Sequence, residues 1–89
     1  MRLLINCAPR YLLPRFYFDI DEDGALAPDE EGIECETRDA VRETAIDALP
    51  GLAADLAMPG DRHVLKIMVR DEEGEPVFHA SLTVEAGWR

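Results

Sequence analysis

Residues 37–58, TRDAVRETAIDALPGLAADLAM, form the stretch around which the rest of the chain is organised. Its apolar residues recur at steps of three and four: Val41, Ala45, Ala48, Leu49, Leu52 and Leu56. This spacing gathers side chains onto one face of an α-helix, while the charged residues between them stay in water. The stretch therefore predicts an amphipathic helix that needs an apolar surface to pack against.

The sequence indicates where this helix begins, but a proline leaves its second half open to two interpretations. Thr37 suits an N-cap, because its hydroxyl can accept a hydrogen bond from an amide of the first turn. Pro50 interrupts the pattern, since a proline inside a helix removes one hydrogen bond and costs about 3 kcal/mol. The apolar spacing nevertheless continues past it. Two interpretations stay open: one kinked helix, or a stop with Pro50 in the first turn of a second helix.

Two segments after the helix have the alternating pattern of strands with one buried face. The inward sets are Leu65, Ile67 and Val69 in residues 63–70, and Phe78, Ala80, Leu82 and Val84 in residues 77–85. An acidic turn over residues 71–76 joins the two segments. Pairing Val69 with Phe78 sets apolar residues opposite apolar ones along the hairpin. A slip by one residue would turn one set to the other face, so this register is strongly favoured.

The segment before the helix predicts shorter strands. In residues 15–20, RFYFDI, every second side chain is predicted to point toward the core, namely Phe16, Phe18 and Ile20. Glycine-containing acidic turns at residues 21–24 and 29–32 then separate short extended segments. The sum is an α+β fold in the order ββαββ, an antiparallel sheet packed against one helix that is kinked or split at Pro50.

One domain is expected over residues 14–89. The segment 1–13 is too short and too broken by polar residues and proline for a signal peptide or a membrane span. We predict a poorly ordered N-terminal extension there. Cys7 and Cys35 are the two cysteines and form no CxxC pair. Nothing in the sequence requires a disulfide between them, so we expect a reducing, cytoplasmic setting and leave the disulfide as the alternative.

The chain of 89 residues carries 19 acidic and nine basic residues, a net charge of −10. Such a surface repels phosphate backbones and anionic lipids, which bind through clustered Lys and Arg. The composition therefore disfavours nucleic-acid and membrane binding. It favours a basic protein or a cation as a partner.

An acidic loop matches the calcium-binding pattern D-x-[DN]-x-[DN]-G-x5-E. The residues in its ligand positions are Asp19, Asp21, Asp23 and Glu30. The entering segment, however, is predicted as a strand, whereas this loop normally follows a helix, and Pro28 opposes an exiting helix. A solvated acidic turn explains the same residues. Calcium stays an alternative, and no other cofactor is expected.

No catalytic constellation is recognised. His63 and His79 lie at different ends of the predicted hairpin and have no cysteine at the spacing of zinc ligands. Cys35 lies between two glutamates that disfavour its thiolate. Ser81 lies in a strand without a nucleophile elbow. We therefore predict a protein that is not an enzyme and has no catalytic residues.

The outer face of the C-terminal hairpin is the better candidate site. Its residues are Val64, Lys66, Met68, Arg70, Val77, His79, Ser81 and Thr83. They are half apolar and locally basic on an acidic protein, a combination that suits a second copy or an acidic partner segment. An ordinary solvated sheet face is the alternative.

From residue 14 onward the chain resembles a family of short bacterial proteins, common in alphaproteobacteria, catalogued only as a domain of unknown function. The likeness rests on PRFYFDI at 14–20, DEEG at 29–32, the helix at 40–48 and VRDEEGEPVF at 69–78. This resemblance implies no activity and no catalytic residues. A looser likeness is to HicB-type antitoxins, small acidic proteins that bind a basic toxin.

Together these observations favour a small cytoplasmic protein-interaction module that is not an enzyme and that forms a homodimer. An antitoxin-like or regulatory partner of a basic protein is the first alternative. A calcium-binding module is the second.

Overall fold

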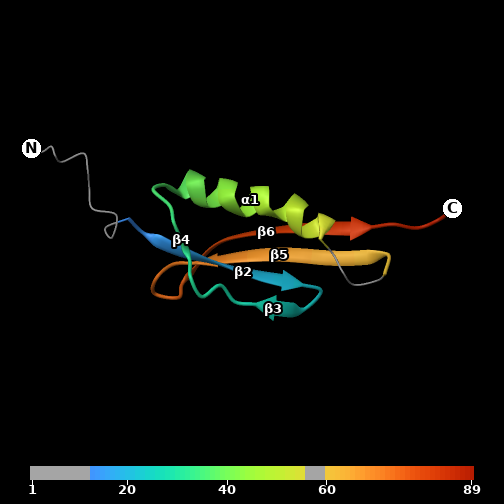
Figure 1. The fold of residues 1–89 in the computed structure, drawn as a ribbon, viewed down its shortest axis with the longest axis horizontal. Helices are drawn as coiled ribbons and strands as arrows, with labels where there is room; N and C mark the ends of the chain where they lie inside the picture. Colours follow the sequence, from blue (N-terminus) through green and yellow to red (C-terminus); the bar gives the residue numbers. More distant parts are fainter. Residues whose placement is uncertain (1–12, 56–59) are drawn as a thin grey trace, which may run out of the picture.

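One helix lies along one face of an antiparallel sheet in the computed structural model, which describes residues 13–55 and 60–89 (Figure 1). The elements are β2 (Arg15–Glu22), β3 (Ala25–Ala27), β4 (Ile33–Glu34), α1 (Arg38–Ala54), β5 (Arg62–Arg70) and β6 (Pro76–Glu85). The predicted α+β fold with one helix on an antiparallel sheet is confirmed. Most of the expected extension at 1–13 lies outside the described residues.

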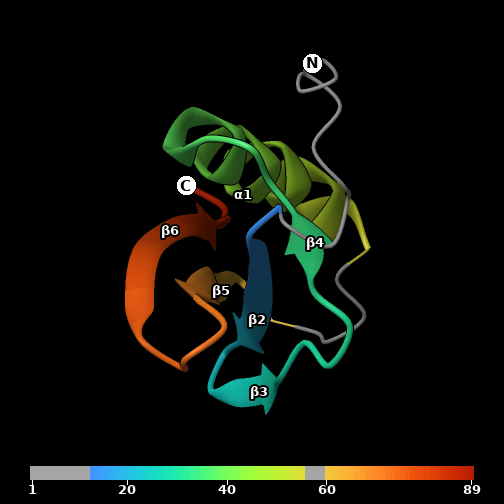
Figure 2. The same cartoon turned by 90° about the vertical axis from the view of Figure 1, so that its left-hand side faces the viewer.

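The strand order is β3-β2-β5-β6, and the short β4 also pairs with β2. The longest strands, β5 and β6, form the C-terminal hairpin, and β2 lies on the other side of β5. This arrangement places β5 in the centre of the sheet and leaves β6 at its edge. Figure 2 shows the sheet strongly curved, with β6 on one side, where the described residues add no further strand.

The predicted hairpin register is confirmed over most of its length. Val69 pairs with Phe78, and Leu65 pairs with Leu82. The pattern changes next to the turn, where Arg70 pairs with Pro76 and leaves Val77 as an extra residue. This β-bulge shifts the side-chain alternation, because two residues of β6 oppose one step of β5. Val77, which was expected on the outer face, therefore packs against the core as well as lining a hollow on that face.

The core is formed where α1 crosses β5. Its buried members are Phe18, Cys35, Val41, Ala45, Leu49, Leu65, Ile67 and Val69. Three of them come from α1 at the predicted spacing of four, and three from alternate positions of β5. Ala48 departs from the predicted stripe, since it is exposed, and Leu56 lies outside the described residues.

The helix continues through Pro50, so the single-helix interpretation is correct. Thr37 is the N-cap, and its Oγ1 accepts a hydrogen bond from the amide of Ala40 at 3.0 Å. The helix ends at Ala54, four residues before the predicted end at Met58, which lies outside the described residues. Pro50 is exposed, so its ring stays clear of the core. Within the described residues, no helix is long and apolar enough to cross a membrane.

Candidate functional site

The three aspartates of the predicted calcium loop are engaged in separate hydrogen bonds. Asp21 accepts from the amide of Gly24 at 2.7 Å and closes its own turn. Asp19 lies on the side of β2 away from the helix and accepts from Nε of Arg70 at 2.9 Å and from the amide of Asp29 at 2.8 Å. Glu30 is exposed. Over residues 13–55 and 60–89, no three His, Cys, Asp or Glu side chains lie together as a metal-binding group.

Asp29 holds the loop between β3 and β4 in place. Its carboxylate accepts hydrogen bonds from the amides of Phe18, Glu31 and Gly32 at 3.0–3.1 Å. Burial by itself raises the pKa of the Asp29 carboxyl, but the three amide hydrogen bonds outweigh it and lower the pKa below its usual value. Sequence reasoning missed this residue. The available signal was an aspartate three residues before a glycine, a common turn pattern.

Arg70 connects β5 to β2 and to the same loop. Besides its ion pair with Asp19, it donates to the carbonyl of Asp29 at 2.9 Å, and its guanidinium lies 4.7 Å from the centre of the Tyr17 ring. The hydrogen bond with Asp19 raises the pKa of Arg70. Its charge is thus already matched within the chain. Arg70 belongs to the predicted outer face, but its contacts are structural.

Asp23 and His63 join the β2–β3 turn to the start of β5. Asp23 has a φ of 53° and accepts from the amide of Val64 at 2.7 Å. Its other carboxylate oxygen lies 2.7 Å from Nδ1 of His63, which is buried, and Nε2 of His63 lies 3.2 Å from the carbonyl of Gly60. Both ring nitrogens face acceptors, so the imidazolium satisfies both contacts and the neutral ring only one.

This pair predicts a pH dependence of stability. The hydrogen bond to Asp23 raises the pKa of His63 above 6.5, and the same bond lowers the pKa of Asp23 below 3.8. The contribution of His63 is therefore complete below its unfolded-state pKa and is lost as the pH rises through the folded-state pKa. We expect the melting temperature to fall as the pH rises from about 6.5 through the folded-state pKa of His63.

Two measurements check this expectation. Thermal unfolding followed by circular dichroism across that range should show the fall in the natural chain and a smaller fall in His63→Gln. Titration of the imidazole proton shifts by NMR should give His63 a pKa above its model-peptide value. A melting temperature that is unchanged or rises with pH would contradict the assignment.

The outer face of the hairpin is only partly as predicted. Met68 lies opposite His79 and Lys66 opposite Ser81, as the register required. A hollow of about 600 Å³ extends over this region. Its lining residues are Lys66, Met68, Pro76, Val77, Phe78, His79, Ala80 and Ser81. Val77 thus lines this hollow and also packs against the core, and Arg70 is engaged in internal contacts. The centre of the predicted face is a hollow, largely apolar surface.

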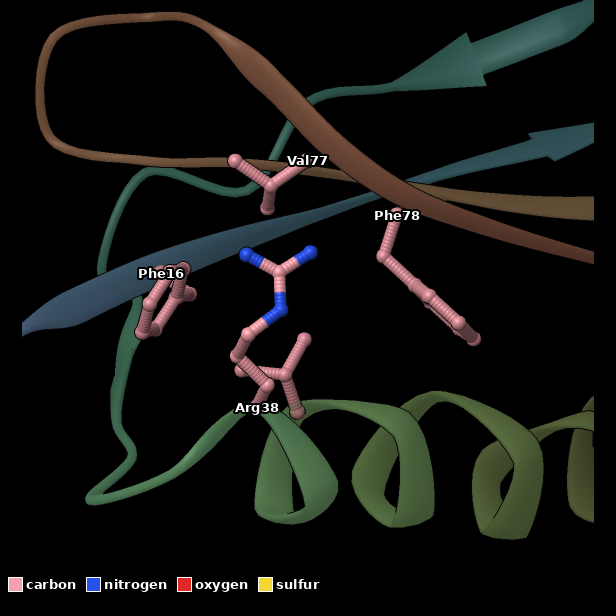
Figure 3. A pocket seen from close by; sticks show the side chains of 5 residues that line it. Phe16, Arg38, Val77 and Phe78 are labelled. Carbon is pink, nitrogen blue, oxygen red and sulfur yellow. The ribbon is translucent and has the colours of Figure 1, made fainter.

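A second, smaller pocket of about 70 Å³ lies where α1 begins (Figure 3). Its lining residues are Phe16, Arg38, Val41, Val77 and Phe78. The guanidinium of Arg38 points between the side chains of Phe16, Val77 and Phe78 (Figure 3). In the described part of the chain, no carboxylate forms an ion pair with Arg38. Arg38 is therefore a cation with apolar neighbours.

Sequence reasoning missed this pocket because it placed Val77 on the outer face of the hairpin. Arg38, one of the charged helix residues expected to stay in water, is exposed as predicted. The bulge is the cause of the difference. With regular alternation, Val77 would lie on the outer face, but the bulge brings Val77 to the core side next to Phe78. No short-range sequence signal marks this change.

Cys35, the one described cysteine, is a core residue. It is 4% exposed and forms no disulfide. Burial raises the pKa of its thiol, a shift that a hydrogen bond with Thr44 opposes. A protonated, buried thiol behaves as a small apolar side chain rather than as a nucleophile.

Comparison with known proteins gives one match. Neither the curated proteins nor the solved structures include a match to this chain. A family profile, however, matches residues 15–83, which span the sheet from β2 to most of β6 together with α1. That match covers well over half of the chain and agrees with the resemblance seen in the sequence. The chain therefore belongs to the family described as Domain of unknown function (DUF6894).

Proposed function

We propose that this protein is an interaction module, not an enzyme, that forms a homodimer by antiparallel pairing of β6 with β6 of a second copy. The observation that carries the proposal is the outer edge of β6. This strand of ten residues pairs with β5 on one side, and the described residues provide no strand on the other. A free edge offers a row of backbone donors and acceptors to another strand.

The edge lacks the protection that monomeric proteins usually give to such strands. Charged side chains, prolines and bulges commonly block edge pairing. Here Pro76 and the bulge at Val77 affect only the first two residues of the strand. The following residues, FHASLTV at 78–84, contain no Asp, Glu, Lys or Arg, in a chain that is 31% charged. Seven residues are therefore open to pairing.

Charge is distributed so that two copies can approach at this edge. β5 and β6 together carry three basic residues and one acidic residue, a net charge of +2. The net charge of the whole chain is −10, so the residues outside these two strands carry a net charge of −12. Repulsion between two acidic molecules is therefore weakest where the hairpins meet. A domain this small also gains stability from association.

The geometry of such a dimer follows from two-fold symmetry. An isologous contact places the same strand on both sides, so the sheet would continue from β5 through β6 into the partner's β6 and β5. The two apolar hollows around Met68 and His79 would then lie on one continuous face. A second copy thus satisfies the backbone of the edge and enlarges the candidate site.

The experiment is size-exclusion chromatography with light scattering on the full chain, over a range up to high micromolar concentration. We expect a mass of twice 10.0 kDa that falls on dilution. The variant Ser81→Lys/Thr83→Lys, which sets like charges opposite each other across the two-fold axis, should be monomeric. Ala25→Lys, on the exposed strand β3, is the control and should remain dimeric.

Two results would overturn the proposal. One is a natural chain that stays monomeric at the highest concentration. The other is a dimer that the Ser81→Lys/Thr83→Lys variant does not weaken, because the interface would then lie elsewhere. Capture of a basic partner by an otherwise monomeric chain would favour the regulatory alternative instead.

A further inference from the structure

We propose that Trp88 of each copy covers the pocket around Arg38 in its partner, and so locks the two hairpins together. The inference rests on the proposed β6 dimer and adds a residue from the partner to a site that is incomplete without it. The pocket is the one formed by Phe16, Arg38, Val41, Val77 and Phe78.

Trp88 is the residue in the described chain that most needs a partner. It is 103% exposed, whereas an indole normally buries a large apolar area in a core or an interface. The last backbone hydrogen bond before it runs from the amide of Ala86 to the carbonyl of Asp61, at 2.7 Å. Trp88 therefore lies only two residues beyond a fixed point of the hairpin, on a short tether.

Its own pocket is out of reach. The pocket lies at the start of β6, beside Val77 and Phe78, and Trp88 lies beyond the other end of the same strand. The ten intervening residues of extended chain span roughly 33 Å. Figure 1 shows the same separation, with the C-terminus at the opposite end of the molecule from the β5–β6 turn.

Antiparallel pairing of two copies brings Trp88 of one copy close to the pocket of the other. When two copies of β6 run in opposite directions, the end of one strand lies beside the start of the other. A two-fold axis at Leu82 would set Trp88 opposite the partner's Pro76, and an axis at Thr83 would set it opposite the partner's Phe78. Both registers bring the indole to the mouth of the partner's pocket.

The chemistry of the pocket suits an aromatic ring. Arg38 presents a guanidinium without an anionic partner among the described residues, and its neighbours Phe16, Val77 and Phe78 are apolar. An indole face attracts such a cation and covers the apolar side chains at the same time. About 70 Å³ is too small to enclose an indole. The ring would therefore lie flat across the opening.

Trp88 is the single tryptophan of the chain, so its fluorescence reports this contact directly. On the full chain, emission spectra and acrylamide quenching would be recorded during dilution from the dimer to the monomer. Acrylamide is neutral, and its access is not biased by the net charge of −10. We expect the dimer to emit at shorter wavelength and to be quenched several-fold less than the monomer.

Two helix variants separate the pocket from the strand contact. Arg38→Ala should keep the dimer, weaken it about tenfold and restore the emission of an exposed indole. Arg42→Ala removes an exposed arginine one turn further along α1, outside the pocket, and should change neither property. Trp88→Ala should weaken the dimer to the same extent as Arg38→Ala.

The outcomes distinguish the two proposals. A dimer in which Trp88 stays as open to acrylamide as in the monomer would overturn this inference and leave the β6 interface standing. Equal effects of Arg38→Ala and Arg42→Ala on emission would also overturn it. A chain that remains monomeric would overturn both proposals.

Discussion

Leu65→Ala is expected to lower the free energy of unfolding by about 2–5 kcal/mol. Leu65 lies on the central strand β5, is 0% exposed, and pairs on its two sides with Glu22 of β2 and Leu82 of β6. Its truncation removes buried apolar surface and leaves a cavity between the sheet and α1 that neighbouring side chains cannot fill by a small shift.

Urea denaturation at one fixed protein concentration measures this change, because the stability of an associating protein depends on concentration. Met68→Ala is the control on the same strand, since Met68 lies on the outer face and is 36% exposed. Its loss should be clearly smaller. Equal losses for the two variants would contradict the placement of the core between β5 and α1.

Gly32→Ala is expected to destabilise the fold by at least about 1–3 kcal/mol, the usual cost of a strained backbone conformation. Gly32 has a φ of +76°, where a side chain is unfavourable. A Cβ at this position would also lie 2.7 Å from Cγ of Arg15 and 3.0 Å from a ring carbon of Tyr17. Arg15 donates to the carbonyls of Glu31 and Gly32, so it cannot move away without losing these bonds.

Gly24→Ala provides the matched control. Gly24 has a φ of +94°, but no atom lies within 4 Å of the position that a Cβ would take. The difference between the two variants in urea midpoint therefore measures the crowding by Arg15 and Tyr17, apart from the backbone strain that both share. If Gly24→Ala is as costly as Gly32→Ala, crowding contributes nothing, and the close contact of this loop with β2 is not important for stability.

The polar contacts of the protein are concentrated away from β6. Asp19, Asp29 and Arg70 fasten the loop beside β2, and Asp23 with His63 fastens the β2–β3 turn to β5. The acidic turns that suggested calcium binding thus serve to hold loops through internal hydrogen bonds. Among the features of the described residues that have no internal partner are the edge of β6, the guanidinium of Arg38 and the indole of Trp88. These three features meet in the dimer proposed here.

The helix and the hairpin register could be predicted because both depend on short-range periodicity. Val41, Ala45 and Leu49 lie on one face of any helix, whatever they pack against. The pairing of Leu65 with Leu82 follows from alternation, since only one parity buries both apolar sets. The family resemblance rested on the same segments and is confirmed by the profile match.

The candidate sites depended on contacts that the sequence does not encode locally. Asp23 and His63 are forty residues apart, and their pairing needs the β2–β5 register to bring the turn to the start of β5. Without that register, Asp23 is one of several acidic residues in a turn. The calcium pattern likewise counts residues and does not show which group each carboxylate contacts. In the structure Asp19, Asp21 and Asp23 accept hydrogen bonds from different parts of the chain.

The amino-acid sequence by itself determined the amphipathic helix, the strands and their parity, because the period of the apolar residues identifies each of these elements. Only the tertiary structure decided that the helix runs through Pro50, that Val77 bulges toward the core and that Arg38 points between apolar side chains. The physical reason is that these outcomes balance a local cost against packing between distant segments. That balance exists only once the segments are in contact.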